Sequence, residues 1–457
     1  MNTHMEKISE HILSTSFEAL APEKLANAKY RIIDVLGCVI GGAHAAGNSA
    51  LIDLVKAWGG KEEATIFVSG GKAPAHNVAM VNSVLARSYD FEATQARVNG
   101  VNFPSHISGT TVTTALALGE AGNISGKELI TALLVGDDVA CRILAASGFG
   151  FSKGWDNVGT VNALGATAIA GRLLGLSPQQ LQNAFGIVLN QLAGSFETIW
   201  DGAGAFKLVQ GLSARNGIFS AALAKAGWTG PQDALLGKFG YFNLYTEGCN
   251  PDILTADLGQ EYHTEVTYKP YPGCRANHAA VDCAFELVGK YTVPVDEIEQ
   301  IILQVPAAVR DMFVGQPFII RDVPQIDAAF SIRYCVANIL LRKKITLEHF
   351  QEHLIRDPRI ASIANKILIE GFVDVKSRGA VLKVKMRNGQ EYSAEVSFAK
   401  GDPVFSPLSQ EEVKQKFMRN VAFSQTISEV NAKKLLAMIE NLEELNKLSD
   451  LIRLMTI

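Results

Sequence analysis

The run from Ser105 to Gly217 constrains the fold most strongly, because it is unusually rich in Ala, Gly, Ser and Thr. Segments such as GTTVTTALALGEAG and GTVNALGATAIAGRLLGL repeat these residues every three or four positions, which places them on one face of a helix. Small side chains at that spacing let helices approach closely. Charged residues inside the run argue against membrane helices. We therefore predict a dense, all-helical body that extends to about residue 265.

Helical periodicity also marks both ends of the chain. Apolar residues recur at the spacing of one buried helix face in residues 22–40, and similar patterns continue as far as residue 89. After Gly401-Asp402-Pro403 the helical period returns in residues 413–417 and 430–451. Because this tail has no strand pattern of its own, we expect it to pack against the N-terminal helices.

The composition changes after Lys269. Ile298 to Val305 and Gly379 to Phe398 alternate between apolar and polar residues, and Arg387-Asn388-Gly389 divides the second run with a hairpin turn signal. Helical patterns lie between these strands, over residues 279–290, 328–341 and 347–355. This part is typical of a smaller α+β domain, so the predicted fold class is mainly α.

Composition and charge exclude several classes of protein. The chain has 457 residues, of which 48% are hydrophobic, and a formal net charge of −4. There is no broad basic surface for nucleic acid, and no apolar run reaches the ~20 residues that a membrane span needs. The N-terminus shows no secretion signal pattern. We expect a cytoplasmic protein without a nucleic-acid or membrane partner.

Motifs for metals and nucleotide cofactors are missing from the sequence. The six cysteines are scattered, with no CxxC pair, and HExxH does not occur. Glycine-rich segments do not have the GxGxxG or GxxxxGK[ST] spacing. We therefore expect reduced thiols, no metal and no cofactor.

The segment from Lys269 to Cys283, KPYPGCRANHAAVDC, concentrates candidate chemistry. Two prolines stiffen it, and it carries Lys269, Arg275 and His278 within ten positions. Three such groups repel one another unless an anion lies between them, and a substrate carboxylate is the simplest candidate. The plainer alternative is a proline-stiffened linker with solvated charges.

Other segments supply further candidates. Asp90 and Thr94 end one helical pattern, and His106 lies just before the next, so a general base and the group that orients it are possible here. Lys207 is a rare charge at the start of a close-packed helix, and Asp156 has the position of a helix N-cap. Each has a structural alternative: solvated carboxylates, a capping histidine and a lysine that reaches to solvent.

Taken together, these fragments resemble the MmgE/PrpD family over nearly the whole chain. A DFDDT-like element corresponds to residues 90–94, an HPSG-like element to residues 106–109, and KPYPGCRANH to residues 269–278. The segments around Gly159-Thr160, Arg172 to Leu176, Lys207 to Gly217 and Ala329 to Tyr334 follow in the family's order.

The resemblance implies an architecture and a site. It implies a large helical domain built from residues 1–266 and 400–457, a smaller α+β lid domain over residues 267–399, and a homodimer. It also implies a cofactor-independent site for di- or tricarboxylates. Carried over by position, that site contains Asp90, Thr94, His106, Lys207, Lys269 and His278. We add Arg275 because of its charge.

Three positions depart from the family pattern. Asp156 stands where the family usually has a histidine, Ala93 replaces the last acidic residue of DFDDT, and His106 is followed by Ile107 instead of proline. A carboxylate at position 156 repels a substrate carboxylate that a histidine holds, and it favours a substrate with an amine or imine.

The expected chemistry is proton transfer at a carbon next to a carboxyl or carbonyl group. Lys207, Lys269 and Arg275 are expected to stabilise the developing oxyanion. His106 and His278 are the candidate base and acid, with Asp90 as the orienting group and Thr94 and Asp156 as substrate contacts.

Loss of a hydroxyl group makes this reaction a dehydration, whereas return of the proton to the opposite face makes it an epimerisation. We expect a lyase of the 2-methylcitrate dehydratase type. The alternatives are an isomerase of the iminodisuccinate epimerase type, a lyase of the cis-aconitate decarboxylase type, and a carboxylate-binding protein without turnover.

Overall fold

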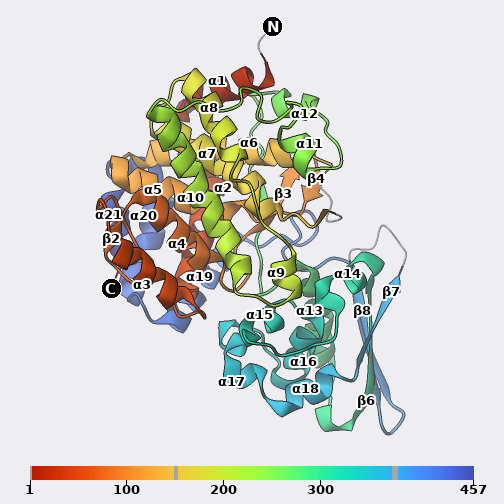
Figure 1. Cartoon of the computed structure of the whole chain (residues 1–457). Coiled ribbons are helices and arrows are strands. Elements are labelled where there is room, and N and C mark those ends of the chain that lie inside the picture. Colours follow the sequence, from red (N-terminus) through yellow and green to blue (C-terminus); the bar gives the residue numbers. More distant parts are fainter. Residues whose placement is uncertain (1–2, 149–152, 373–378, 457) are drawn as a thin grey trace.

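Small residues allow the central helices to pack closely. In the computed structural model, which describes residues 3–148, 153–372 and 379–456, helix α7 (Val161–Leu173) packs against α10 (Ala205–Lys225). A Cβ at Gly217 of α10 would lie 2.6 Å from the Ala166 methyl of α7, so only glycine permits this crossing. The predicted dense helical packing is confirmed, and the fold is mainly α (Figure 1).

The body is built largely from long helices. They are α1 (His4–Ser14), α2 (Pro22–Gly41), α3 (Asn48–Trp58), α4 (Ala75–Arg87), α5 (Ile107–Gly122), α6 (Gly126–Ala146), α7, α8 (Pro178–Leu189), α10, α19 (Gln410–Ser424) and α20 (Glu429–Glu440). Shorter helices join them: α9 (Glu197–Trp200), α11 (Tyr241–Tyr245), α12 (Asp252–Thr255) and α21 (Ser449–Ile452). No helix of the described residues is long and apolar enough to cross a membrane.

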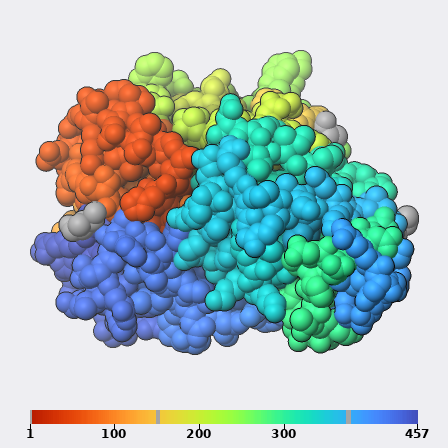
Figure 2. Space-filling view, turned by 90° about the horizontal axis from the view of Figure 1, so that it is seen from below, coloured from red at the N-terminus to blue at the C-terminus, as the bar shows by residue number. Residues whose placement is uncertain are grey.

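The two ends of the chain meet in this body, as the helical pattern of the tail predicted. Helix α19 packs against α2, and the C-terminal helices lie beside the N-terminal ones (Figures 1 and 2). A buried ion pair joins them, with Lys416 Nζ of α19 2.7 Å from Asp34 Oδ1 of α2. Lys416 also donates to the Phe91 carbonyl, and Asp34 Oδ2 accepts the Ala93 N–H. The pair thus fixes the loop that follows α4.

The middle of the chain forms the α+β part. Its mixed sheet has the order β7-β6-β8-β9, with β6 parallel to β7 and antiparallel to β8. The predicted hairpin is confirmed, because β8 and β9 pair antiparallel and Gly389 has the positive φ of a tight turn. Strand β7, parallel to its neighbour, was not predicted. The strands are β6 (Ile298–Pro306), β7 (Ile367–Phe372), β8 (Ala380–Met386) and β9 (Glu391–Val396).

Helices cover this sheet. Helix α13 packs on β8 and β9, and α16 packs on α13. The helices of this part are α13 (His278–Lys290), α14 (Ala307–Asp311), α15 (Pro324–Ala329), α16 (Ile332–Arg342), α17 (Glu352–Ile355) and α18 (Pro358–Ala364). The buried apolar residues of the chain divide into two clusters, one from residues 5–262 and 413–455 and the other mainly from residues 279–399. The domain boundaries near residues 266 and 400 stay a prediction.

The helical body is not purely helical, which corrects the sequence prediction. It contains a short pair, β1 (Ala64–Thr65) and β2 (Lys72–Ala73), and a three-stranded sheet of order β4-β3-β5. Strands β3 (Thr94–Val98) and β4 (Val101–Phe103) form a hairpin around Asn99-Gly100, where both residues have positive φ. Strand β5 (Glu265–Thr267) comes from a distant part of the chain and pairs antiparallel with β3.

Removing the Lys416 ammonium tests how much the buried ion pair stabilises the body. We expect Lys416→Met to lower the free energy of unfolding by about 3–5 kcal/mol, because it leaves the Asp34 carboxylate buried without its cation. Lys433→Met is the matched control, since Lys433 pairs with Glu429 on the exposed surface of α20 and is expected to cost at most about 1 kcal/mol. Urea unfolding curves measure both, and equal losses in the two variants would contradict this role for Lys416.

Candidate active site

The β4-β3-β5 sheet brings together segments that are far apart in the sequence. Thr94 begins β3 and pairs with Thr267 of β5, two residues before Lys269. Strand β4 ends at Phe103, three residues before His106. The sheet therefore carries the residue 90–94 loop, the His106 segment and the Lys269 segment to one place.

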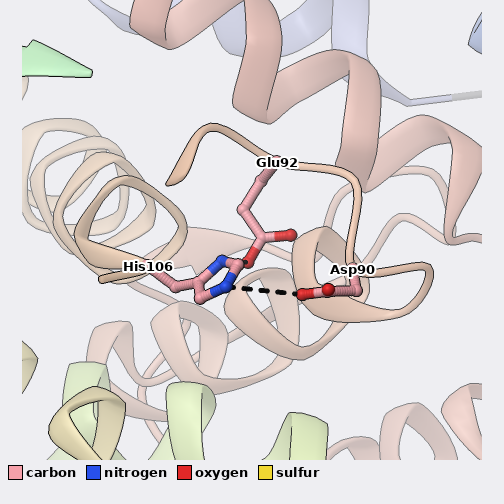
Figure 3. A group of neighbouring side chains, drawn as sticks. All are labelled: Asp90, Glu92 and His106. Atoms are coloured by element: carbon pink, nitrogen blue, oxygen red, sulfur yellow. Dashed lines mark hydrogen bonds and ion pairs between the residues drawn. The ribbon is translucent and has the colours of Figure 1, made fainter. Parts of the chain in front are cut away.

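A buried arginine forms the centre of that place. Arg87, the last residue of α4, directs Nη1 at Asp90, Glu92 and His106. The Nη1 atom lies 2.9 Å from Glu92 Oε1 and 2.8 Å from His106 Nδ1, and it forms an ion pair with Asp90 Oδ1. Figure 3 shows the two carboxylates and the imidazole converging from the loop after α4 and the segment before α5. Four ionisable groups thus form one cluster.

Lys269 completes the charge balance of the cluster. Its Nζ lies 3.0 Å from Asp90 Oδ2 and donates to the Asp90 carbonyl at 2.6 Å. Asp90 therefore has a cation on each carboxylate oxygen. Its backbone lies in the left-handed region, with φ of 48°, a conformation that non-glycine residues seldom adopt. The contacts with Arg87 and Lys269 hold Asp90 in that conformation.

The count of hydrogens in the cluster favours one tautomer of His106. Arg87 Nη1 carries two hydrogens but faces three acceptor positions, on Asp90, Glu92 and His106. If His106 carries its proton on Nδ1, that proton meets Glu92 Oε1 at 3.1 Å, and the two hydrogens of Nη1 serve the carboxylates. We infer the Nδ1–H tautomer, which leaves a lone pair on Nε2.

The surroundings of Nε2 suit a proton acceptor. Thr94 Oγ1 lies 3.4 Å away and donates its own hydrogen to the Ser105 carbonyl, so it offers Nε2 a lone pair and no hydrogen. Asp90 Oδ1 lies 3.6 Å away. Neutral Nε2 thus has no hydrogen-bond donor among these neighbours, whereas protonated Nε2 finds two acceptors.

The pKa values follow from burial and the two cations. Burial raises the pKa of Asp90, but Arg87 and Lys269 outweigh it and hold that pKa well below its usual range. Burial likewise raises the pKa of Glu92, and Arg87 and His106 reverse this and lower it to about 2. Burial, Arg87 and Lys269 together lower the pKa of His106 to about 4, against the opposite effect of the carboxylates. At neutral pH both acids are ionised and His106 is neutral.

The cluster opens into a cavity of about 420 Å³. Arg87, Asp90, Thr94 and His106 line one side of it. The apolar part of the lining comes from α9, α14 and their neighbours, with Ile199, Val309, Met312, Phe313 and Phe330. The volume and the mixture of apolar surface with a few polar groups fit a small-molecule site.

Asp156 lines the same cavity and keeps one oxygen open to it. Its Oδ1 accepts the Val158 N–H at 3.0 Å and caps the short helix η3 (Asn157–Gly159), as the N-cap alternative predicted. No residue that the structure describes donates to Oδ2. Burial raises the pKa of this carboxyl, and Arg87 opposes the shift. Asp156 is therefore both a cap and a second titratable group of the cavity.

Arg275 lines the cavity, whereas His278 lies behind it. The Arg275 Nη atoms donate to the Ala399 and Lys400 carbonyls, and Nη1 lies 3.2 Å from His278 Nδ1. His278 is fully buried and is not among the described residues that line the cavity. Burial, Arg275 and Lys269 hold the pKa of His278 well below its usual range.

Lys207 also lies outside the cavity lining that the structure describes. Its Nζ donates to the Ala46 carbonyl and to Asn48 Oδ1 at 2.7 Å, so it joins α10 to the start of α3. Burial lowers its pKa to about 8. The structure thus places Asp90, Thr94, His106, Asp156 and Arg275 along one cavity, with Lys269 paired to Asp90. Lys207 and His278 are not among the described lining residues.

Sequence reasoning missed the central residue, Arg87. A signal was available, because Arg87 is an isolated charge in the otherwise uncharged helical run HNVAMVNSVLAR and stands three residues before Asp90. Glu92 was considered only as a member of its motif. Asp402, which lines the cavity and accepts the Val404 and Phe405 N–H groups, was seen only as part of a turn.

Asp90, Glu92 and His106 have ligand atoms within 4.8 Å of one another, a spacing compatible with a metal ion. Arg87 Nη1 lies within hydrogen-bond distance of all three residues and supplies a positive charge at that point. We infer that the guanidinium takes the place that a cation needs.

The fold and the site define a class: a mainly helical protein with an acid–base cluster that faces an internal cavity. Comparison with known families identifies it further. The MmgE/PrpD N-terminal domain matches residues 6–254, and the MmgE/PrpD C-terminal domain matches residues 271–444. The chain belongs to the MmgE/PrpD family, as the resemblance indicated.

Three curated relatives are similar over most of their length. Cis-aconitate decarboxylase of Homo sapiens is 26% identical over 407 residues, which cover 84% of this chain and 80% of that protein. Cis-aconitate decarboxylase of Aspergillus terreus is 25% identical over 461 residues, covering 94% and 91%. A cis-aconitate decarboxylase-like protein of Aspergillus oryzae is 22% identical over 426 residues, 86% of each chain.

The protonation of His106 is open to direct measurement. We expect its imidazole to titrate near pH 4 and to stay neutral from pH 5 to pH 8, because burial and two cations disfavour the imidazolium. Carbon–proton correlation spectra of the histidine rings at stepped pH measure this, with His106→Gln used to assign the resonance. A midpoint at pH 6.5 or above would contradict the charge arrangement described for the cluster.

Proposed function

We propose that the protein is a cofactor-independent lyase that removes a proton from the carbon next to a carboxylate. The observation that carries the proposal is the position of His106, which lines the cavity and has two acceptors, Thr94 Oγ1 and Asp90 Oδ1, beside its Nε2. Glu92 orients the ring from the other nitrogen. A neutral imidazole held in this way is a general base.

Removal of that proton places negative charge on the carboxylate of the substrate. Arg275 is the cavity-lining cation best suited to this carboxylate, because no carboxylate of the described residues lies within ion-pair distance of it. Arg87 and Lys269 are bound to Asp90 and contribute their field from behind. Fixed cations in a cavity with little water stabilise such a developing charge strongly.

Elimination then needs a second proton for the leaving group. Asp156 also lines the cavity, and burial raises its pKa above the usual value, so this carboxylate is the proposed group that takes up a proton and passes it to the leaving group. In the proposed step the C–H electron pair forms the new C=C bond and the C–O bond breaks. The hydroxyl leaves as water with a proton from Asp156, while the first proton stays on His106 Nε2. This is a dehydratase-type reaction.

A decarboxylase is the second candidate, because the relatives are named cis-aconitate decarboxylases. That reaction breaks a C–C bond, releases CO2 and uses the electron pair to take a proton at carbon. It therefore starts from a protonated donor. The low pKa of His106 supports dehydration in preference to decarboxylation.

The test is a panel of acids followed by NMR in deuterated water. We expect 2-methylcitrate, citrate or malate to lose water, with alkene signals and solvent deuterium exchanged at the carbon next to a carboxylate. Release of CO2 from cis-aconitate would instead support the decarboxylase. Exchange with inversion of iminodisuccinate would support an epimerase. Turnover of none of these acids would contradict the proposed lyase.

His106→Gln provides the matched variant for this assay. We expect it to lower kcat by about 10²–10⁴-fold, because glutamine keeps the volume of the side chain but accepts no proton. His353→Gln is the control, since His353 is exposed and is not among the described residues that line the cavity. Equal rates in the two variants would exclude His106 as the base.

A further inference from the structure

The charges around the cavity are unfavourable for a highly anionic ligand. Arg87 and Lys269 are already paired with Asp90, and Arg87 also faces Glu92. These two cations and two carboxylates cancel one another. They leave no net positive charge for a substrate.

The remaining charged side chains of the described lining are Arg275, Asp156 and Asp402. Asp402 Oδ1 is held by two backbone N–H groups, and its charge acts on Arg275. Arg275 thus supplies one positive charge against two acidic groups. A ligand with three carboxylates meets an electrostatic penalty here, because the described lining residues offer no free cation for the charges beyond the one at Arg275.

Asp156 offers the opposite kind of contact. It is 4% exposed, and its Oδ2 has no donor from the described residues while it lines the cavity. A carboxylate oxygen that lines a cavity without a donor from the protein is available to a ligand, so a donor group on the ligand gains free energy at this point. The apolar residues Ile199, Phe313 and Phe330 of the lining need no hydrogen-bond donor from the ligand.

We propose that Asp156 is a specificity-determining residue that selects a carboxylic acid with a hydroxyl or ammonium group and with fewer than three carboxylates. One carboxylate binds at Arg275, the donor group binds at Asp156 Oδ2, and the remainder of the ligand packs on the apolar residues of the lining. This inference rests on the proposed function and narrows its substrates. It separates this chain from a site built for a tricarboxylate.

Four acids test the proposal by titration calorimetry at pH 7. Malate and aspartate differ from succinate by a hydroxyl and an ammonium group, and citrate adds a third carboxylate to a hydroxyl. We expect malate or aspartate to bind at least about tenfold more tightly than succinate, as one good hydrogen bond to a charged group allows. Citrate is expected to bind more weakly than the better of the two. Preference for malate identifies the donor as a hydroxyl, and preference for aspartate identifies it as an ammonium.

Asp156→Asn keeps the cap on Val158 but removes the negative charge. We expect it to reduce the preference over succinate and to strengthen citrate binding by about tenfold, because one repulsive charge is lost from the cavity wall. Misfolding cannot produce a gain in citrate binding. Asp53→Asn on the exposed side of α3 is the control and is expected to change nothing.

Two results would overturn the proposal: succinate binding as tightly as malate and aspartate in the wild-type protein, or ratios that Asp156→Asn leaves unchanged. The comparison with succinate uses only the wild-type protein, so it remains valid even if Asp156→Asn unfolds the chain. These binding ratios do not depend on turnover. The proposed lyase is contradicted if no acid exchanges a proton. The selection by Asp156 is contradicted only if the affinities for malate and aspartate do not exceed that for succinate, or if Asp156→Asn leaves these ratios unchanged.

Discussion

The structure depends on the contact between one buried guanidinium and two carboxylates. Arg87 holds Asp90 and Glu92 ionised inside the protein, and these acids in turn fix the ring of His106. Without the arginine, two buried carboxylates would repel each other and take up protons. With it, the imidazole stays neutral and presents one nitrogen to the cavity. The acid–base character of the site is therefore set by a residue that performs no proton transfer itself.

The rest of the fold brings the partners of Arg87 together. A three-stranded sheet connects the loop after α4 with the His106 and Lys269 segments, and α19 from the end of the chain braces that loop through Lys416. Both ends of the chain and the distant strand β5 thus determine where the side chains around Arg87 lie. This arrangement explains why likeness to the family extends over nearly the whole chain and is not confined to one motif.

Much of the fold could be predicted from the sequence, and the features that were missed have physical causes. Helical periodicity and small-residue spacing predicted the body, and the Arg387-Asn388-Gly389 signal predicted the β8–β9 hairpin. Asn99-Gly100 is an equal turn signal, but no hairpin was predicted there, since its strands are short and lie among helices. Lys207 and His278 were placed in the site by position along the chain, which does not reveal the direction of a side chain. Neither is among the described residues that line the cavity, and their roles stay a prediction. Burial of charge, as at Arg87, likewise needs three-dimensional contacts.

The central claim is that Arg87 and Glu92 hold His106 as a neutral ring with its proton on Nδ1. Long-range proton–nitrogen correlation of the histidine rings at pH 7 tests it most directly, because protonated and bare ring nitrogens have well-separated shifts. We predict a protonated Nδ1 and a bare Nε2 for His106. A proton on Nε2 alone, or on both nitrogens, would contradict it.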